Sequence, residues 1–296
     1  CFVVLCCAVL CCVVLCCVVL FCVVLCCVVL CCVVVVVCWC CVGVGVGVGT
    51  NNTNDDTNDN GNNNAFNYNS SDIDITVMLN RPISAEELRV IAQFHKQLEQ
   101  KFEVWSKRFE CTYTPIDMLS SIKPPSKPRP WYWGGENKLY LEATYGNEWI
   151  INNYLLYHHA ISLFGPDFKT LMKPVDILEV QKACIRDLFT EWVSKKNDPD
   201  YFSNSHYTAY FILNLCRILY TVICKQVGDK PTASSWVKGS FDNQWNDLIH
   251  QAQAWKYGVE LDLHTEALQF LDFVIAQVSQ TQLFKQLESE LQLNTQ

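Results

Sequence analysis

Two aspartates, Asp72 and Asp74, stand two residues apart in an otherwise apolar run, SDIDITVML. On a β-strand, residues two apart point to the same face, so their carboxylates would project side by side about 7 Å apart. Hard divalent cations such as Mg²⁺ are held by one or two carboxylates together with substrate phosphates. The spacing therefore predicts a site for a magnesium ion and a phosphorylated ligand, and a solvated polar strand face is the alternative interpretation.

A third carboxylate follows on the next expected strand, residues 109–114. Glu110 alternates there with apolar residues and would lie on the polar face of the strand. Three acids on neighbouring strands can bind a metal ion and accept a proton from an attacking hydroxyl group, which are the two requirements of nucleotidyl transfer. Glu110 is the candidate general base.

The elements that would position these acids follow from local sequence patterns. Residues 72–79 alternate between polar and apolar side chains and predict a strand. Ser84 and Glu87 have the spacing of a capping box, and the apolar residues that follow recur at helical intervals, which predicts a helix over residues 85–102. The order strand, helix, strand is typical of an α+β domain.

A proline-rich segment, KPPSKPRP at 123–130, separates these elements from a helical second half. Its prolines exclude a regular element, and we expect the irregular segment to extend to Gly135. Beyond Gly146 the apolar pattern is helical to the end of the chain. The expected helices cover residues 148–165 (capped by Gly165), 175–195, 207–225 and 261–293.

The first 64 residues differ from the rest in composition. Residues 1–48 carry no charged side chain and repeat the pentapeptide VVLCC, which a GTTGT pentanucleotide repeat encodes in one reading frame. Residues 50–64 are rich in Asn, Asp and Thr and lack the apolar content needed to fold. We therefore expect no folded domain in 1–64, a first domain over 65–146 and a second over 147–296. The apolar repeat is long enough for a membrane span, so membrane contact is expected only if it inserts.

Charge and cysteine content restrict the class of partner. The chain carries a formal net charge of −8, which disfavours non-specific binding of nucleic acid and suits a cationic small substrate. All but four of the 19 cysteines lie in the apolar repeat, and the four stand alone in apolar contexts. They are predicted to be buried core thiols of a cytoplasmic protein. These cysteines are Cys111, Cys184, Cys216 and Cys224.

Several stretches carry a resemblance to a known family. They are SDIDI at 71–75, FECTYTP at 109–115, YGNEWIINNYLLYHHAISLFGPD at 145–167, LNLCRILYTV at 213–222 and DKPTASSWV at 229–237. Over about residues 70–280 the chain resembles an aminoglycoside adenylyltransferase of the streptomycin/spectinomycin type. The resemblance implies a mixed sheet with helices, similar to the polymerase-beta nucleotidyltransferase domain, followed by an all-α domain. It also implies an antibiotic-resistance enzyme that transfers AMP from MgATP to an aminoglycoside hydroxyl and releases pyrophosphate.

The same resemblance assigns roles to residues of the first domain. Asp72 and Asp74 would be the metal ligands at the catalytic centre, and Glu110 would deprotonate the drug hydroxyl and contact the drug. Ser71 would contribute to nucleotide binding. The family also has a Gly-Ser phosphate loop about ten residues before its two aspartates. Here that position falls near Gly61 and has no serine, and no preceding strand is expected, so the first domain is predicted to be incomplete.

Further assignments fall in the helical half. Lys230 matches the family lysine that reaches the nucleotide phosphates, Trp149 matches an aromatic residue of the aminoglycoside site, and Arg217 matches a recurrent arginine without an assigned role. An exposed turn would also explain Lys230, and packing at a helix start would also explain Trp149. His158 and His159 face different directions on their helix and are interpreted as structural.

Two other hypotheses remain open at this stage. The chain could be a non-catalytic remnant that lacks the phosphate loop, or a nucleotidyltransferase with a different hydroxyl acceptor, including a protein. In either case the expected state is a monomer in the cytoplasm that does not bind nucleic acid.

Overall fold

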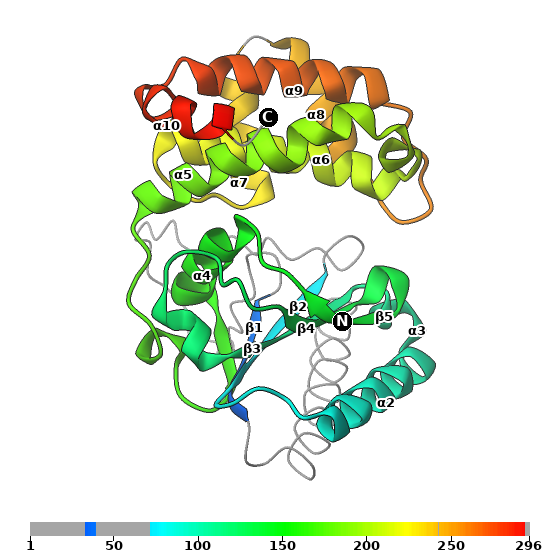
Figure 1. The fold of residues 1–296 in the computed structure, drawn as a ribbon. Coiled ribbons are helices and arrows are strands. Elements are labelled where there is room, and N and C mark those ends of the chain that lie inside the picture. Colours follow the sequence, from blue (N-terminus) through cyan, green and yellow to red (C-terminus); the bar gives the residue numbers. More distant parts are fainter. Residues whose placement is uncertain (1–32, 40–71, 242, 294–296) are drawn as a thin grey trace, which may run out of the picture. The chain divides into compact units, whose positions relative to one another are not determined.

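The computed structural model describes residues 33–39, 72–241 and 243–293. These residues divide into two compact units. Figure 1 labels their helices and strands, except β6. The described part of the first unit comprises 33–39, 72–145 and 155–174, and that of the second comprises 146–154, 175–241 and 243–293. The domain borders expected from the sequence stay predictions.

The first unit is built on a mixed sheet. Its elements are β1 (Val33–Trp39), β2 (Ile73–Leu79), α2 (Ala85–Lys101), α3 (Glu103–Ser106), β3 (Phe109–Pro115), β4 (Arg129–Trp133), β5 (Lys138–Ala143), α4 (Glu148–His159, whose first part belongs to the second unit) and β6 (Ile161–Phe164). The strand order is β5-β4-β3-β2-β1-β6. Only β2 and β3 pair in parallel among these neighbours, as expected for strands joined through a helix.

One face of the sheet is covered by α2. The apolar stripe of α2 is buried, including Phe94 at 2% exposure. The His95 ring stacks on the ring of Tyr132 with centroids 3.8 Å apart, and His95 Nε2 shares a hydrogen bond of 2.9 Å with the Tyr113 hydroxyl. Because Cys111 and Tyr113 alternate with Glu110 and Thr112 along β3, the acids lie on the opposite face.

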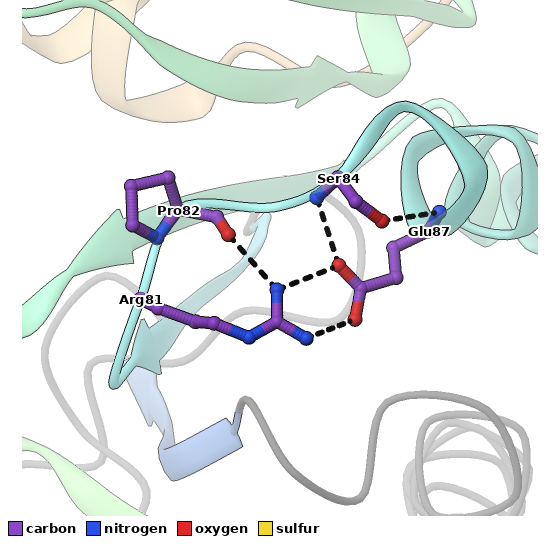
Figure 2. Close-up of polar contacts among 4 residues, drawn as sticks. All are labelled: Arg81, Pro82, Ser84 and Glu87. Atoms are coloured by element: carbon purple, nitrogen blue, oxygen red, sulfur yellow. Dashed lines mark hydrogen bonds and ion pairs between the residues drawn. The ribbon is translucent and has the colours of Figure 1, made fainter.

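A polar network fixes the link from β2 to α2, and Figure 2 shows its geometry. The Ser84 hydroxyl accepts the Glu87 backbone N–H at 3.3 Å, and a Glu87 carboxylate oxygen accepts the Ser84 N–H at 2.8 Å. Both oxygens of Glu87 also accept from the guanidinium group of Arg81, at 3.0 and 2.9 Å. The predicted capping box is confirmed, and such a cap contributes about 1 kcal/mol.

Two predictions for the first unit are wrong. The proline-rich segment was expected to stay irregular to Gly135, but Arg129–Trp133 forms β4. Pro130, which has no N–H, lies where the register with β5 shifts, so the strand tolerates it. The helix expected to reach Gly165 ends at His159, and Ile161–Phe164 forms β6. Gly165 adopts a positive φ of 86° after that strand instead of capping a helix.

The start of the chain gives a third correction. No strand was expected before β2, yet Val33–Trp39 pairs antiparallel with β2 and with β6. The segment reads VVVVVCW, and β-branched residues favour extended backbone. Residues 1–32 and 40–71, which include Gly61 and Ser71, lie outside the described part of the chain.

The second unit is helical. It contains α5 (Ile177–Asp187), α6 (Ser205–Cys224), α7 (Lys230–Ser240), α8 (Asn246–Ala254), α9 (His264–Ser279) and α10 (Gln282–Leu293). α6 contacts α5, α7, α8 and α9 and forms the centre of the core. Among the described residues α6 is also the one helix long and apolar enough to span a membrane, and 67% of its apolar window is buried, as in a core helix.

Two predicted helices of this unit are shorter than expected. The helix over 175–195 leaves α-geometry after Asp187 and continues as a π-turn over Leu188–Trp192. The Thr190 hydroxyl donates to the Arg186 carbonyl at 2.9 Å in this turn. The helix over 261–293 is interrupted at Thr281, whose hydroxyl accepts the Phe284 N–H at 3.2 Å and so begins α10.

The isolated cysteines are buried largely as predicted. Cys111, Cys184 and Cys216 are at most 4% exposed, and Cys224 is half-buried. Burial raises the pKa of each of the three buried thiols to about 12. These three groups are therefore inert core side chains rather than nucleophiles.

Candidate active site

The register of β2 and β3 brings two of the predicted acids together. Asp74 is the direct partner of Glu110 in the parallel pair, and Thr76 is the partner of Thr112. Paired residues of adjacent strands are about 4.8 Å apart and point to the same face. Asp72 immediately precedes β2 and shares this periodicity. Asp72, Asp74 and Glu110 are all partly exposed, so solvent and ligands can reach them.

Side chains on this face of β2 and β3 become less exposed to solvent toward the C-terminal ends of the two strands. Thr76 is 8% exposed and Thr114 only 1%, and the Thr114 hydroxyl shares a hydrogen bond of 2.7 Å with that of Tyr145. At the far end Met78 packs into a buried cluster with Leu156 and Phe168. The carboxylates therefore lie at the accessible end of this face, and apolar packing holds the other end of β2 in place.

The donor set suits magnesium. Within the described part of the chain, no three His, Cys, Asp or Glu side chains gather closely enough to hold a metal ion by themselves. Magnesium does not need such a group, because it is commonly held by one or two carboxylates, water and the phosphates of its nucleotide. Asp72 and Asp74 offer oxygen ligands of the kind that a hard cation prefers.

A row of aromatic rings lies beside the acids, and the sequence analysis missed it. Trp133 of β4 is the register partner of Glu110, and Trp131 is the partner of Thr112. The Trp131 ring is nearly parallel to that of Trp133, with centroids 5.9 Å apart, and it stacks on Tyr140 of β5 at 5.5 Å. All three rings are partly exposed. We call Trp131, Trp133 and Tyr140 the aromatic row.

Two glycines, Gly134 and Gly135, follow β4 next to Trp133, at positions where a side chain would clash with neighbouring atoms. A Cβ atom on Gly134 would lie 1.9 Å from the Ser106 carbonyl oxygen, so the backbone there has no room for a side chain. A Cβ atom on Gly135 would lie 2.9 Å from two indole atoms of Trp133. The absence of a side chain at Gly135 therefore makes room for the Trp133 ring.

In the second unit, Lys230 is the first residue of α7. Asp229 caps this helix, because its carboxylate accepts the Thr232 N–H at 2.7 Å. The Lys230 ammonium group lies 5.1 Å from the ring centroid of Tyr210. Arg217 donates from Nε to the Gly228 carbonyl oxygen at 3.3 Å. Lys230 is partly exposed and thus accessible to a ligand.

The remaining predicted residues show less sign of ligand binding. Trp149 is 4% exposed, so its ring packs within the protein, and its proposed contact with a drug stays a prediction. His158 and His159 are exposed and their ring centroids are 6.1 Å apart. Partial burial, together with the nearby charge of Lys169, lowers the pKa of His158.

Asp187 is a polar group that sequence patterns did not single out. Burial raises the pKa of its carboxyl group to about 7. The hydrogen bond from Trp192 Nε1, 2.7 Å long, opposes this rise, and the charges of Glu148 and Glu191 add to it. The acid lies where α5 ends and the π-turn begins, and such turns are frequent at functional sites.

Comparison with known proteins finds a family that is similar to the second half of the chain. Residues 170–287 match the family described as the C-terminal domain of aminoglycoside adenylyltransferases. Among solved structures, spectinomycin adenyltransferase AAD(9) from Enterococcus faecialis, determined with ATP and spectinomycin, is similar at a TM-score of 0.58 and 18% identity, covering 73% of this chain and 87% of that one. No curated protein matches the chain. The resemblance seen in the sequence is confirmed over residues 170–287, and so is the α+β fold with a helical C-terminal region.

Proposed function

Because residues 170–287 match the C-terminal domain of aminoglycoside adenylyltransferases, we propose that the chain transfers AMP from MgATP to a hydroxyl group of an aminoglycoside such as streptomycin or spectinomycin. One observation carries the proposal. Asp74 and Glu110 are register partners at the accessible end of a sheet face. A metal ligand and a general base are thereby adjacent, as in-line nucleotidyl transfer requires.

Each acid has a distinct role in this reaction. Asp72 and Asp74 would hold Mg²⁺, and the bound ion would supply positive charge against the negative charge that develops on the phosphates. Glu110 accepts the proton of the acceptor hydroxyl as that oxygen attacks the α-phosphorus of ATP. The bond to the bridging oxygen breaks and pyrophosphate leaves. Lys230 binds the phosphates, and Ser71 is proposed to add a hydroxyl contact to the nucleotide.

The neighbours of Glu110 favour a cationic acceptor with apolar faces. Trp133 presents its ring beside the general base, and cations bind well over indole faces. The negative net charge of the chain attracts such an acceptor and repels nucleic acid. We also propose that Trp149 supports the acceptor site. A hydroxyl compound other than an aminoglycoside would need the same combination of charge and apolar surface.

The proposal includes a setting for the enzyme. It acts in the cytoplasm as a monomer, with ATP and the drug as its small-molecule partners. Nucleic acid takes no part in the reaction. The protein contacts a membrane only if the apolar repeat of residues 1–48 inserts into it.

The test is mass spectrometry of streptomycin and spectinomycin after incubation with the full chain and MgATP. We expect a drug–AMP adduct from the wild type and its loss in Asp72→Asn and Glu110→Gln. Asp117→Asn is the matched control, because Asp117 is an exposed aspartate of the same unit on a 3-10 turn. A folded wild type that yields no adduct would instead support the non-catalytic remnant. AMP found on protein would favour a different acceptor.

A further inference from the structure

The ammonium group of Lys230 lies against the face of another side chain. Its Nζ atom is 5.1 Å from the ring centroid of Tyr210, which belongs to α6. A cation over an aromatic face is attracted by the negative potential of the ring. Tyr210 is 39% exposed, so its ring lies at the surface of the second unit, where Lys230 can hold this contact and still face solvent.

Hydrogen bonds connect Tyr210 to the loop that carries Lys230. Asn214 Nδ2 donates to the Tyr210 carbonyl oxygen at 2.9 Å, and its Oδ1 accepts from Arg217 Nη1 at 3.3 Å. Arg217 Nε in turn donates to the Gly228 carbonyl oxygen at 3.3 Å. Because residues 210, 214 and 217 are spaced by four and three, they share one face of α6.

The loop then passes directly into the helix that begins with Lys230. Gly228 precedes Asp229, whose carboxylate caps α7 through the Thr232 N–H. The backbone of Lys230 is therefore fixed from two sides, by the Arg217 hydrogen bond and by the cap, while Tyr210 holds the far end of its side chain. Contacts from one helix thus define both ends of the Lys230 side chain.

We propose that Tyr210, Asn214 and Arg217 are positioning residues that hold Lys230 in place to meet the phosphates of the nucleotide. This inference rests on the role proposed for Lys230 above. A lysine side chain loses rotamer freedom when it binds an anion, and prior restriction of its conformation lowers that loss. Tyr210 restricts the side chain without the competing negative charge that a carboxylate partner would bring.

The first test is calorimetry of MgATP binding to the full chain. Tyr210→Leu should weaken ATP binding about two- to fivefold, the loss expected from one partly exposed cation–π contact. Tyr210→Phe should bind ATP like the wild type, since it keeps the ring. Phe189→Leu is the matched control, because it removes a ring that contacts Phe284 in the same unit, with centroids 5.0 Å apart. It should leave ATP affinity unchanged.

A second readout follows the lysine itself and needs no nucleotide. Lysines are dimethylated with ¹³C-formaldehyde, and the Lys230 signal is assigned by its loss in Lys230→Arg. Its methyl resonance should be displaced by the Tyr210 ring current in the wild type and in Tyr210→Phe, and should return to the position of an exposed lysine in Tyr210→Leu. Arg217→Gln should also reduce the displacement, since it frees the Gly228 loop.

The outcomes separate the two proposals. An unchanged ATP affinity or an unchanged methyl resonance in Tyr210→Leu refutes the positioning role. Failure of the wild type and of every variant to bind ATP, with the displaced resonance intact in the wild type and in Tyr210→Phe, refutes the proposed function and with it any nucleotide role for Lys230.

Discussion

Asp187→Asn should stabilise the protein most at alkaline pH and less in mild acid. The folded carboxyl group has a pKa of about 7, raised from 3.8 mainly by burial. Between these values the folded chain retains a proton that the unfolded chain has lost, so stability falls as pH rises. The rise of about three units corresponds to roughly 4 kcal/mol lost between pH 4 and pH 8. Since Asp187 keeps part of its surface exposed, we expect about 2–4 kcal/mol.

Urea unfolding at pH 5 and pH 8, followed by tryptophan fluorescence, measures this difference. At pH 5 the wild-type carboxyl group is largely neutral, and the asparagine Oδ1 can still accept the Trp192 indole N–H. The unfolded chain is already ionised at pH 5, so the wild type has lost about 1.5 kcal/mol there and should lose about a further 2.5 kcal/mol by pH 8. At pH 8 the variant should be the more stable, whereas Asp247→Asn, which removes an exposed charge on α8, should behave alike at both pH values. An equal effect of Asp187→Asn at pH 5 and pH 8 would refute the reasoning.

Three further expectations concern the first unit. Burial lowers the pKa of His95 to about 3, so the unfolded chain gains a proton first as pH falls, and the wild type should lose about 3 kcal/mol between pH 6.5 and pH 4. His95→Gln should lack this loss in urea unfolding. Gly134→Ala should fail to fold stably by circular dichroism, since its Cβ would meet the Ser106 carbonyl oxygen at 1.9 Å. Gly135→Ala should fold but raise the KM of the acceptor severalfold, because its Cβ displaces the Trp133 indole, and an unchanged KM would separate Trp133 from acceptor binding.

Elements with strong local signals were predicted from the sequence. The alternation of residues 72–79 and 109–114 corresponds to β2 and β3, and the capping box at Ser84 marks the start of α2. The apolar pattern over 207–225 corresponds to α6, Ser205–Cys224. In each case the information lies within a few residues of the chain, so the pattern alone is sufficient.

Elements that depend on a distant partner were missed. β6 has four residues and exists through pairing with β1, more than a hundred residues earlier. β4 contains Pro130, and its pairing with β3 and β5 outweighs the local preference against a strand. The alternation in Trp131-Tyr132-Trp133 was the available signal, since the two tryptophans face the acids while the Tyr132 ring stacks on His95.

The candidate site likewise has features that the local sequence predicts and features that depend on tertiary structure. Alternation alone placed Asp72, Asp74 and Glu110 on polar strand faces, but their proximity depends on a parallel register that no local pattern fixes. The raised pKa of Asp187 arises from burial and from charges on other elements, which a linear pattern does not contain.

The register also places the proposed base beside the proposed acceptor surface. β3 pairs with β2 on one side and with β4 on the other, so Glu110 has Asp74 as one neighbour and Trp133 as the other. Since the proposed base thus lies between the proposed metal ligand and an indole, we expect the acceptor to approach over the Trp133 ring. The aromatic row continues away from the proposed metal ligands toward Tyr140. Asp74, Glu110 and Trp133 are successive partners across three strands. In the proposed reaction the nucleotide would therefore bind on the Asp74 side of Glu110 and the acceptor on the Trp133 side.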